Sequence, residues 1–157
     1  MGIYEVREYF KEHHIPEEIK EFTVSSATVE LAAQALHVAP ALIAKTLSFS
    51  FGESAILVLA AGDARIDNKK YRATFGVKAK MLSAEDALLL TGHAVGGVCP
   101  FALASDLKVY LDVSLQRFET VYPAAGSPAS CVVITPARLL EITAAQWVDV
   151  CQIPPEQ

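Results

Sequence analysis

Residues 44–61 read AKTLSFSFGESAILVLAA, and this segment decides the fold. Its first half alternates with period two, which predicts a strand from Ala44 to Phe51. The face that contains Lys45 is otherwise large and apolar: Leu47, Phe49 and Phe51. After a predicted turn at 52–54, the unbroken apolar run at 55–61 is typical of a strand buried on both faces. We expect this second strand to be central in a sheet.

Helical and strand patterns alternate on both sides of this segment. We expect helices at 3–13, 29–36 and 68–75, helices beginning at Ala84 and Pro136, and helical turns at 40–43 and 114–118. We expect further strands at 77–81, 108–112, 131–134 and 147–151. The pattern predicts an α/β (mixed α+β) fold, with a mixed, barrel-like sheet surrounded by short helices.

Length and composition favour a single globular domain over residues 1–157. Hydrophobic residues make up 52% and charged residues 20% of the 157 residues. No signal peptide and no apolar run long enough for a membrane span is present, so we expect a cytoplasmic protein without membrane contact.

The sequence predicts neither a metal site nor a cofactor. The three cysteines form no C-x-x-C pair, and the four histidines lack chelating spacing, so reduced thiols are expected. No G-x-G-x-x-G or G-x-x-x-x-G-K-[ST] motif is present, which argues against a nucleotide cofactor.

The stretch GHAVGGVCPF at residues 92–101 is a second notable feature. Glycine lets backbone N–H and C=O groups approach a ligand closely, and Pro100 fixes the exit of the loop. A tight connection between a helix and a strand would have the same composition. Lys45 has two interpretations as well: its ammonium either reaches solvent on its aliphatic stem or meets an anion in a pocket.

The charge distribution is uneven. The net charge of −5 argues against sequence-independent nucleic-acid coating, yet residues 65–80 hold a basic cluster with Asp67 as the single acid. The basic side chains are Arg65, Lys69, Lys70, Arg72, Lys78 and Lys80. This cluster is either a phosphate-facing patch or a solvated helix face.

A thiol nucleophile is a further alternative, with Cys99 attacking and His93 taking its proton. No third group that would orient the imidazole is evident, and a cysteine beside proline and phenylalanine is more often a small buried hydrophobe. Ser127 and Ser130 flank a proline in a loop of small residues, where they suit either ligand binding or a plain turn.

Several motifs, in order, resemble the YbaK/ProX family, the free-standing relatives of the editing domain inserted in bacterial prolyl-tRNA synthetases. The motifs are SATVELA at 26–32, IAKTL at 43–47, AAGD at 60–63, GGVCPF at 96–101, YLD at 110–112 and AG at 125–126. The likeness runs from about Ser25 to Ile142, nearly the whole chain.

The resemblance implies an aminoacyl-tRNA deacylase that hydrolyses the ester of a mischarged tRNA without metal or cofactor. Lys45 matches the family's essential lysine, and Gly96 to Pro100 match its G-x-x-x-P loop. On this basis the catalytic group would be Lys45 with the backbone of Gly96 and Gly97. The substrate-binding residues would be Ser26, Thr28, Thr46, Val98, Cys99, Pro100, Gly126 and Ser127.

The partners implied are the acceptor end of an aminoacyl-tRNA, contacted by Lys69, Lys70 and Arg72, and an aminoacyl-tRNA synthetase. A small pocket excludes larger side chains, which favours Ala, Ser or Cys esters of tRNA-Pro. Some family members have a histidine near the second loop, whereas residues 125–130 here have none. A binding module that recognises aminoacyl-tRNA or a synthetase without hydrolysis is the alternative function.

Overall fold

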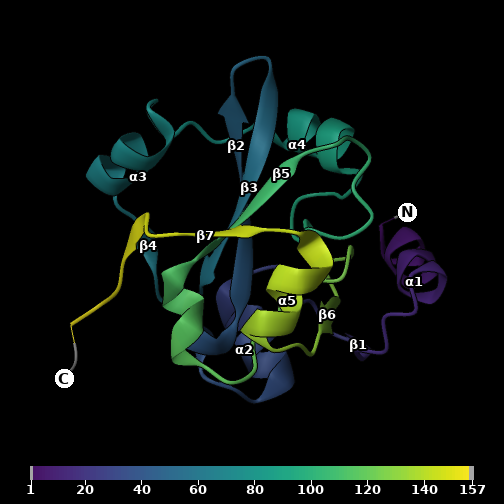
Figure 1. The fold of residues 1–157 in the computed structure, drawn as a ribbon. Coiled ribbons are helices and arrows are strands. Elements are labelled where there is room, and N and C mark those ends of the chain that lie inside the picture. Colours follow the sequence, from purple (N-terminus) through teal and green to yellow (C-terminus); the bar gives the residue numbers. More distant parts are fainter. Residues whose placement is uncertain (1, 156–157) are drawn as a thin grey trace.

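The computed structural model describes residues 2–155 (Figure 1). Its helices are α1 (Ile3–Glu12), α2 (Val29–Leu36), α3 (Asn68–Phe75), α4 (Ala84–Thr91) and α5 (Pro136–Thr143), with 3-10 turns η1 (Pro40–Leu42) and η2 (Val113–Arg117). Its strands are β1 (Ile19–Glu21), β2 (Ala44–Phe51), β3 (Ser54–Ala61), β4 (Arg65–Ile66), β5 (Lys108–Asp112), β6 (Ser130–Val132), β7 (Gln146–Val148) and β8 (Cys151–Gln152). Met1, Glu156 and Gln157, at the ends of the expected domain, lie outside the described residues.

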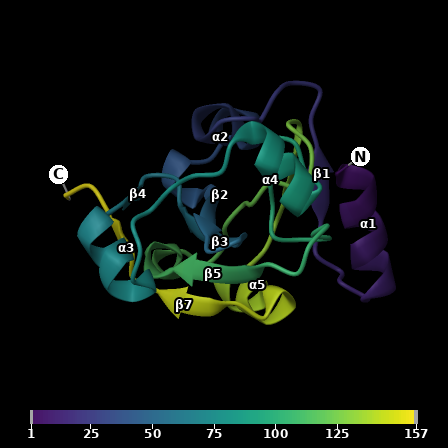
Figure 2. The ribbon, with the colours of Figure 1, turned by 90° about the horizontal axis from the view of Figure 1, so that it is seen from above.

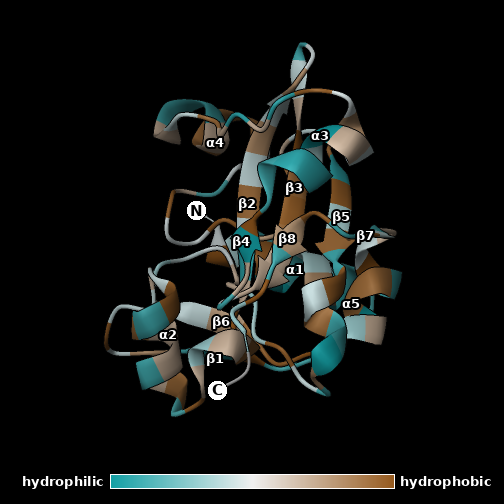
Figure 3. Ribbon diagram, turned by 90° about the vertical axis from the view of Figure 1, so that its left-hand side faces the viewer, coloured by the Kyte–Doolittle hydropathy of each residue, from teal (hydrophilic) through white to brown (hydrophobic). Residues whose placement is uncertain are grey.

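The central sheet has the strand order β2-β3-β5-β7. β2 and β3 are antiparallel, whereas β3 pairs with β5, and β5 with β7, in parallel. Every residue of β3 after Ser54 is buried, which confirms its expected central position. Figure 3 shows the consequence: β3 is strongly hydrophobic and the neighbouring β2 is paler.

Isolated bridges continue the sheet beyond its β2 edge. Ile43 bridges Tyr122, and Val121 bridges Ile134, close to the antiparallel β1–β6 pair. Figure 2 shows α2 and α4 beside β2, and α5 beside β7. The expected mixed α+β class is confirmed, and the mixed sheet curls without closing. Within residues 2–155, no helix has the length and apolar character needed to span a membrane.

Side-chain caps begin the helices where the sequence predicts them. Thr28 accepts a hydrogen bond from the Leu31 backbone at the start of α2, and Ser83 accepts one from Asp86 at the start of α4. The α2 cap matters most for the site, because Thr28 also lines the cavity described below.

Two strand predictions are wrong in detail. Residues 77–81 form no strand. They follow the free edge of β2, where Met81 forms an isolated bridge with Phe49 and the Lys80 carbonyl oxygen accepts a hydrogen bond from the Ser50 backbone N–H. The predicted strand 147–151 is divided into β7 and β8, because β7 pairs with β5 whereas β8 pairs with β4. β1 and β4 were not predicted, since two or three residues show no periodicity.

Candidate functional site

A cavity of about 260 Å³ lies between β2, the start of α2 and the glycine-rich loop before Pro100. It brings together predicted site residues from three distant parts of the chain: Ser26, Thr28, Lys45, Thr46, Gly96 and Val98. The remaining predicted residues do not line it. The volume suits a small chemical group rather than a large ligand.

The β2 wall of the cavity consists of small residues on alternate positions: Ala44, Thr46 and Ser48. Thr46 Oγ1 is buried without a hydrogen-bond partner within the described residues. Leaving a buried hydroxyl unpaired is unfavourable by about 1–3 kcal/mol, so this atom is available to a bound ligand. Sequence reasoning missed Ser48, although the period-two pattern of β2 could have identified it.

Lys45 lies on the opposite face of β2 from Thr46. Its Nζ donates to the carbonyl oxygen of Ala64, 2.5 Å away, just beyond the end of β3. Asp63, the residue before Ala64, accepts two hydrogen bonds from the Arg117 guanidinium, at 3.1 and 2.5 Å. Burial lowers the pKa of Lys45, and the nearby Asp63 carboxylate acts against that effect. The ammonium therefore lies half-buried at the start of β2, with N–H groups left to bind a ligand.

The glycine loop reaches the cavity through Gly96, whose φ is +97°. A Cβ on Gly96 would lie 3.1 Å from the Ala27 Cβ in the opposite wall. Gly97 points away from the cavity, since a Cβ there would lie 2.7 Å from the Gly126 carbonyl carbon and the Ser127 nitrogen. Gly97, Gly126 and Ser127 thus pack the two loops together behind the cavity wall.

Cys99 and Pro100 also lie behind the wall. Cys99 is fully buried, and its Sγ lies 3.5 Å from His93 Nε2 and 3.7 Å from the Phe101 carbonyl oxygen. Burial raises the pKa of this thiol to about 12. A neutral, enclosed thiol is a poor nucleophile, which argues against a thiol hydrolase. Two other residues line the cavity: Met81, which is exposed, and Cys131, which is buried. Sequence reasoning selected neither of them.

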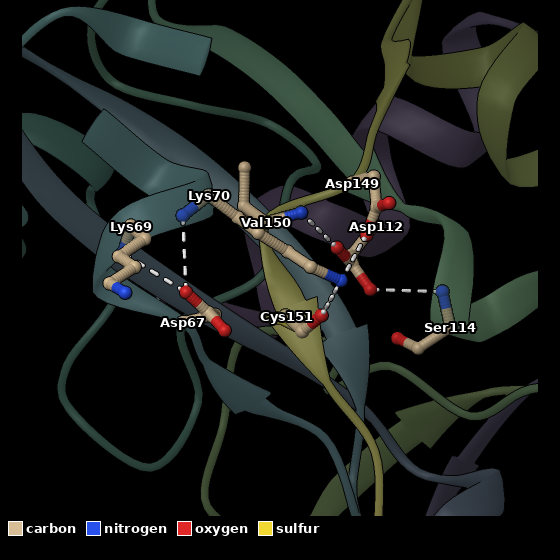
Figure 4. A network of polar contacts seen from close by, with 8 residues as sticks. All are labelled: Asp67, Lys69, Lys70, Asp112, Ser114, Asp149, Val150 and Cys151. Carbon is tan, nitrogen blue, oxygen red and sulfur yellow. Dashed lines mark hydrogen bonds and ion pairs between the residues drawn. The ribbon is translucent and has the colours of Figure 1, made fainter. Parts of the chain in front are cut away.

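The basic residues Lys69, Lys70 and Arg72 lie on α3 and do not line the cavity. Figure 4 shows that the Lys70 ammonium contacts Asp149 at 3.1 Å and the Cys151 carbonyl oxygen at 2.9 Å. Lys70 therefore ties α3 to β8, whereas Lys69 and Arg72 are exposed. Among the residues that the structure describes, no group of three or more His, Cys, Asp or Glu side chains could hold a metal ion.

Comparison with known proteins places this geometry in a family. The profile of the aminoacyl-tRNA editing domain matches residues 23–142, which include β2 and both loops. An uncharacterised protein, YwhH, of Bacillus subtilis (strain 168) is 52% identical over 154 residues, covering 97% of this chain and 98% of that protein.

Two further relatives have functional names. A candidate Cys-tRNA(Pro)/Cys-tRNA(Cys) deacylase, EbsC, of Enterococcus faecalis (strain ATCC 700802 / V583) is 24% identical, over 89% of this chain and 88% of that protein. The crystal structure of a candidate trans-editing enzyme for prolyl tRNA synthetase has a TM-score of 0.88 and 30% identity, with 96% of each chain covered. The chain therefore belongs to the aminoacyl-tRNA editing domain family, and it is an aminoacyl-tRNA deacylase.

Proposed function

We propose that the chain hydrolyses the ester of a mischarged tRNA-Pro carrying a small amino acid, alanine, serine or cysteine. The observation that carries this proposal is the cavity in which Thr46 and Gly96 face the residues before α2. Its volume of about 260 Å³ leaves room for a small aminoacyl group. The name of the EbsC relative, which refers to Cys-tRNA(Pro), supports the same substrate class.

Lys45 binds the terminal nucleotide of the tRNA in this proposal. Its ammonium donates one hydrogen bond to the Ala64 carbonyl, which leaves two N–H groups for a phosphate or ribose oxygen. Within residues 2–155, Lys45 takes part in none of the ion pairs between side chains. An anionic substrate therefore does not have to displace a carboxylate.

The glycine loop supplies the rest of the chemistry. An ester is already labile, so hydrolysis requires positioning of a water molecule and stabilisation of the oxyanion that develops on the carbonyl oxygen. The backbone N–H group of Gly96 is suited to that role, because no side chain separates it from the substrate, whereas the Gly97 N–H already donates to the Ala94 carbonyl oxygen at 2.9 Å. Cys99 is not needed as a nucleophile.

In this proposal, exposed basic side chains bind the acceptor stem of the tRNA. Lys69 and Arg72 on α3 contact the acceptor stem, while Lys70 keeps α3 attached to Asp149 and Cys151. We also propose that the protein acts in the cytoplasm, where tRNAs are charged, and that it works beside a synthetase that produces the mischarged ester.

The decisive experiment measures hydrolysis of alanyl-, seryl- and cysteinyl-tRNA-Pro and of prolyl-tRNA-Pro by the wild type and Lys45→Ala. We expect selective loss of one or more mischarged esters, and a reduction of at least about 100-fold in Lys45→Ala without a change in melting temperature. Lys108→Ala, an exposed lysine on β5, is the matched control.

Unchanged turnover in Lys45→Ala would contradict the role of the lysine. Stable binding of aminoacyl-tRNA without ester loss would instead support the alternative function, a binding module that recognises aminoacyl-tRNA or a synthetase.

A further inference from the structure

His93 lies at the base of the glycine loop, directly after the end of α4. It is only 1% exposed, and its backbone N–H donates to Thr91 Oγ1 at 3.1 Å. Thr91 Oγ1 in turn donates to the Ala87 carbonyl oxygen at 2.6 Å. The backbone of His93 is thus fixed to the last turn of the helix.

The imidazole of His93 connects the two ends of the loop. Nε2 lies 2.7 Å from the Phe101 carbonyl oxygen, which can only accept a hydrogen bond. Nε2 therefore carries the proton, and Nδ1 is the unprotonated nitrogen. Nδ1 has no partner within the described residues. Burial lowers the pKa of His93, which favours this neutral form.

Three glycines, Gly2, Gly97 and Gly126, allow other segments to contact the same loop on its other side. A Cβ on Gly97 would lie 2.7 Å from the Gly126 carbonyl carbon, and a Cβ on Gly126 would lie 2.6 Å from the Gly2 carbonyl carbon. A Cβ on Gly2 would lie 3.4 Å from His93 Nδ1. The start of α1, the second loop and the glycine loop are therefore in backbone contact beside the imidazole.

We propose that His93 is a positioning residue for the deacylation: its Nε2–H group holds the Phe101 carbonyl and so keeps Gly96 aligned at the cavity. The inference rests on the proposed role of the glycine loop. His93 does not touch the substrate, because it does not line the cavity. Its effect is on the geometry of the loop, where a displacement of about 1 Å can reduce a rate about 100-fold.

The test compares His93→Gln with His93→Asn. The glutamine amide can place a donor near the position of Nε2, whereas the shorter asparagine amide reaches only the position of Nδ1. Both variants bury one amide, so a purely structural role would affect them similarly. We expect kcat to stay within about threefold of wild type in His93→Gln and to fall about tenfold or more in His93→Asn, with KM unchanged in both.

Equal losses in the two variants, or no loss in either, would overturn the proposal. A second measurement does not depend on activity or on the folding of a variant. The ¹⁵N chemical shifts of His93 in the wild type should show the neutral Nε2–H form at pH 7, and an Nδ1–H form or an imidazolium would overturn the proposal.

Hydrogen exchange separates this inference from the proposed function. If the wild type hydrolyses none of the esters, the proposed function fails, but amide exchange of residues 94–99 still tests whether His93 holds the loop. Faster exchange in His93→Asn than in His93→Gln supports it, and equal exchange in the two variants overturns it.

Discussion

The two faces of β2 differ sharply although they belong to one strand. On one face, Thr46 and Ser48 leave room for the cavity. On the other, Phe49 packs against Tyr71 of α3, with ring centroids 5.1 Å apart, and Tyr71 packs against Phe75 at 4.7 Å. Small side chains leave space that a ligand can occupy, whereas aromatic side chains fill the space and hold α3 in place.

This difference also explains the position of Lys45. The lysine belongs to the packed face, and at the start of the strand its ammonium extends to the Ala64 carbonyl oxygen instead of into the aromatic cluster. Lys45 still lines the cavity at the start of β2, although its side chain leaves the strand on the opposite face from Thr46.

The largest effect is expected from Gly97→Ala, which changes the loop contact behind the cavity wall. The new Cβ would lie 2.7 Å from backbone atoms of the second loop, so the two loops must separate. We expect kcat/KM for the preferred ester to fall about 100-fold. Gly52→Asn is the control, because a Cβ at Gly52 meets nothing within 4 Å and asparagine tolerates its φ of +62°. Equal activity in both variants would show that the loop contact does not matter.

A smaller effect on the cavity face of β2 is expected from Thr46→Val, which removes the unpartnered hydroxyl at nearly constant volume. We expect hydrolysis of seryl-tRNA-Pro to fall about tenfold relative to alanyl-tRNA-Pro, because only the serine side chain can hydrogen-bond to that hydroxyl. The free energy of unfolding should rise by about 1–3 kcal/mol, because the buried hydroxyl that is removed has no hydrogen-bond partner in the free protein. Thr46→Ser, which keeps the hydroxyl, should retain the wild-type preference; an unchanged ratio in Thr46→Val would remove Thr46 from side-chain recognition.

The packed face is tested through α3. Replacing Lys69 and Arg72 together by alanine should raise KM about three- to fivefold and weaken its dependence on salt, since fewer phosphates are neutralised. The double variant Lys11→Ala/Lys108→Ala removes the same charge from exposed sites elsewhere and should leave KM unchanged. If both pairs raise KM equally, net charge rather than a contact surface governs tRNA binding.

The smallest effect is expected from thiol chemistry. Burial raises the pKa of Cys99, Cys131 and Cys151 to about 12, so at pH 7.5 each thiol is protonated and unreactive. Iodoacetamide should therefore leave the mass and the activity of the folded protein unchanged, while the denatured protein takes up three labels. Rapid labelling of Cys99 with loss of hydrolysis would restore the thiol mechanism.

Local sequence patterns determined most of the secondary structure. The period-two run at 44–51 and the apolar run at 55–61 identified β2 and β3, and the capping residues Thr28 and Ser83 located α2 and α4. These signals are strong because they depend only on neighbouring residues. The motifs around Lys45 and Gly96 also identified the family, since such motifs are linear in the sequence.

The tertiary structure alone decided which of these residues share a cavity. The family resemblance placed Gly97 and Cys99 in the predicted site, yet a Cβ on Gly97 would meet Gly126, and Cys99 contacts His93, both behind the cavity wall. It also decided that residues 77–81 follow the edge of β2 as an irregular segment, and that Lys70 ties α3 to β8. Contacts between distant segments depend on packing, and no local pattern encodes how backbones from several parts of the chain fit against one another.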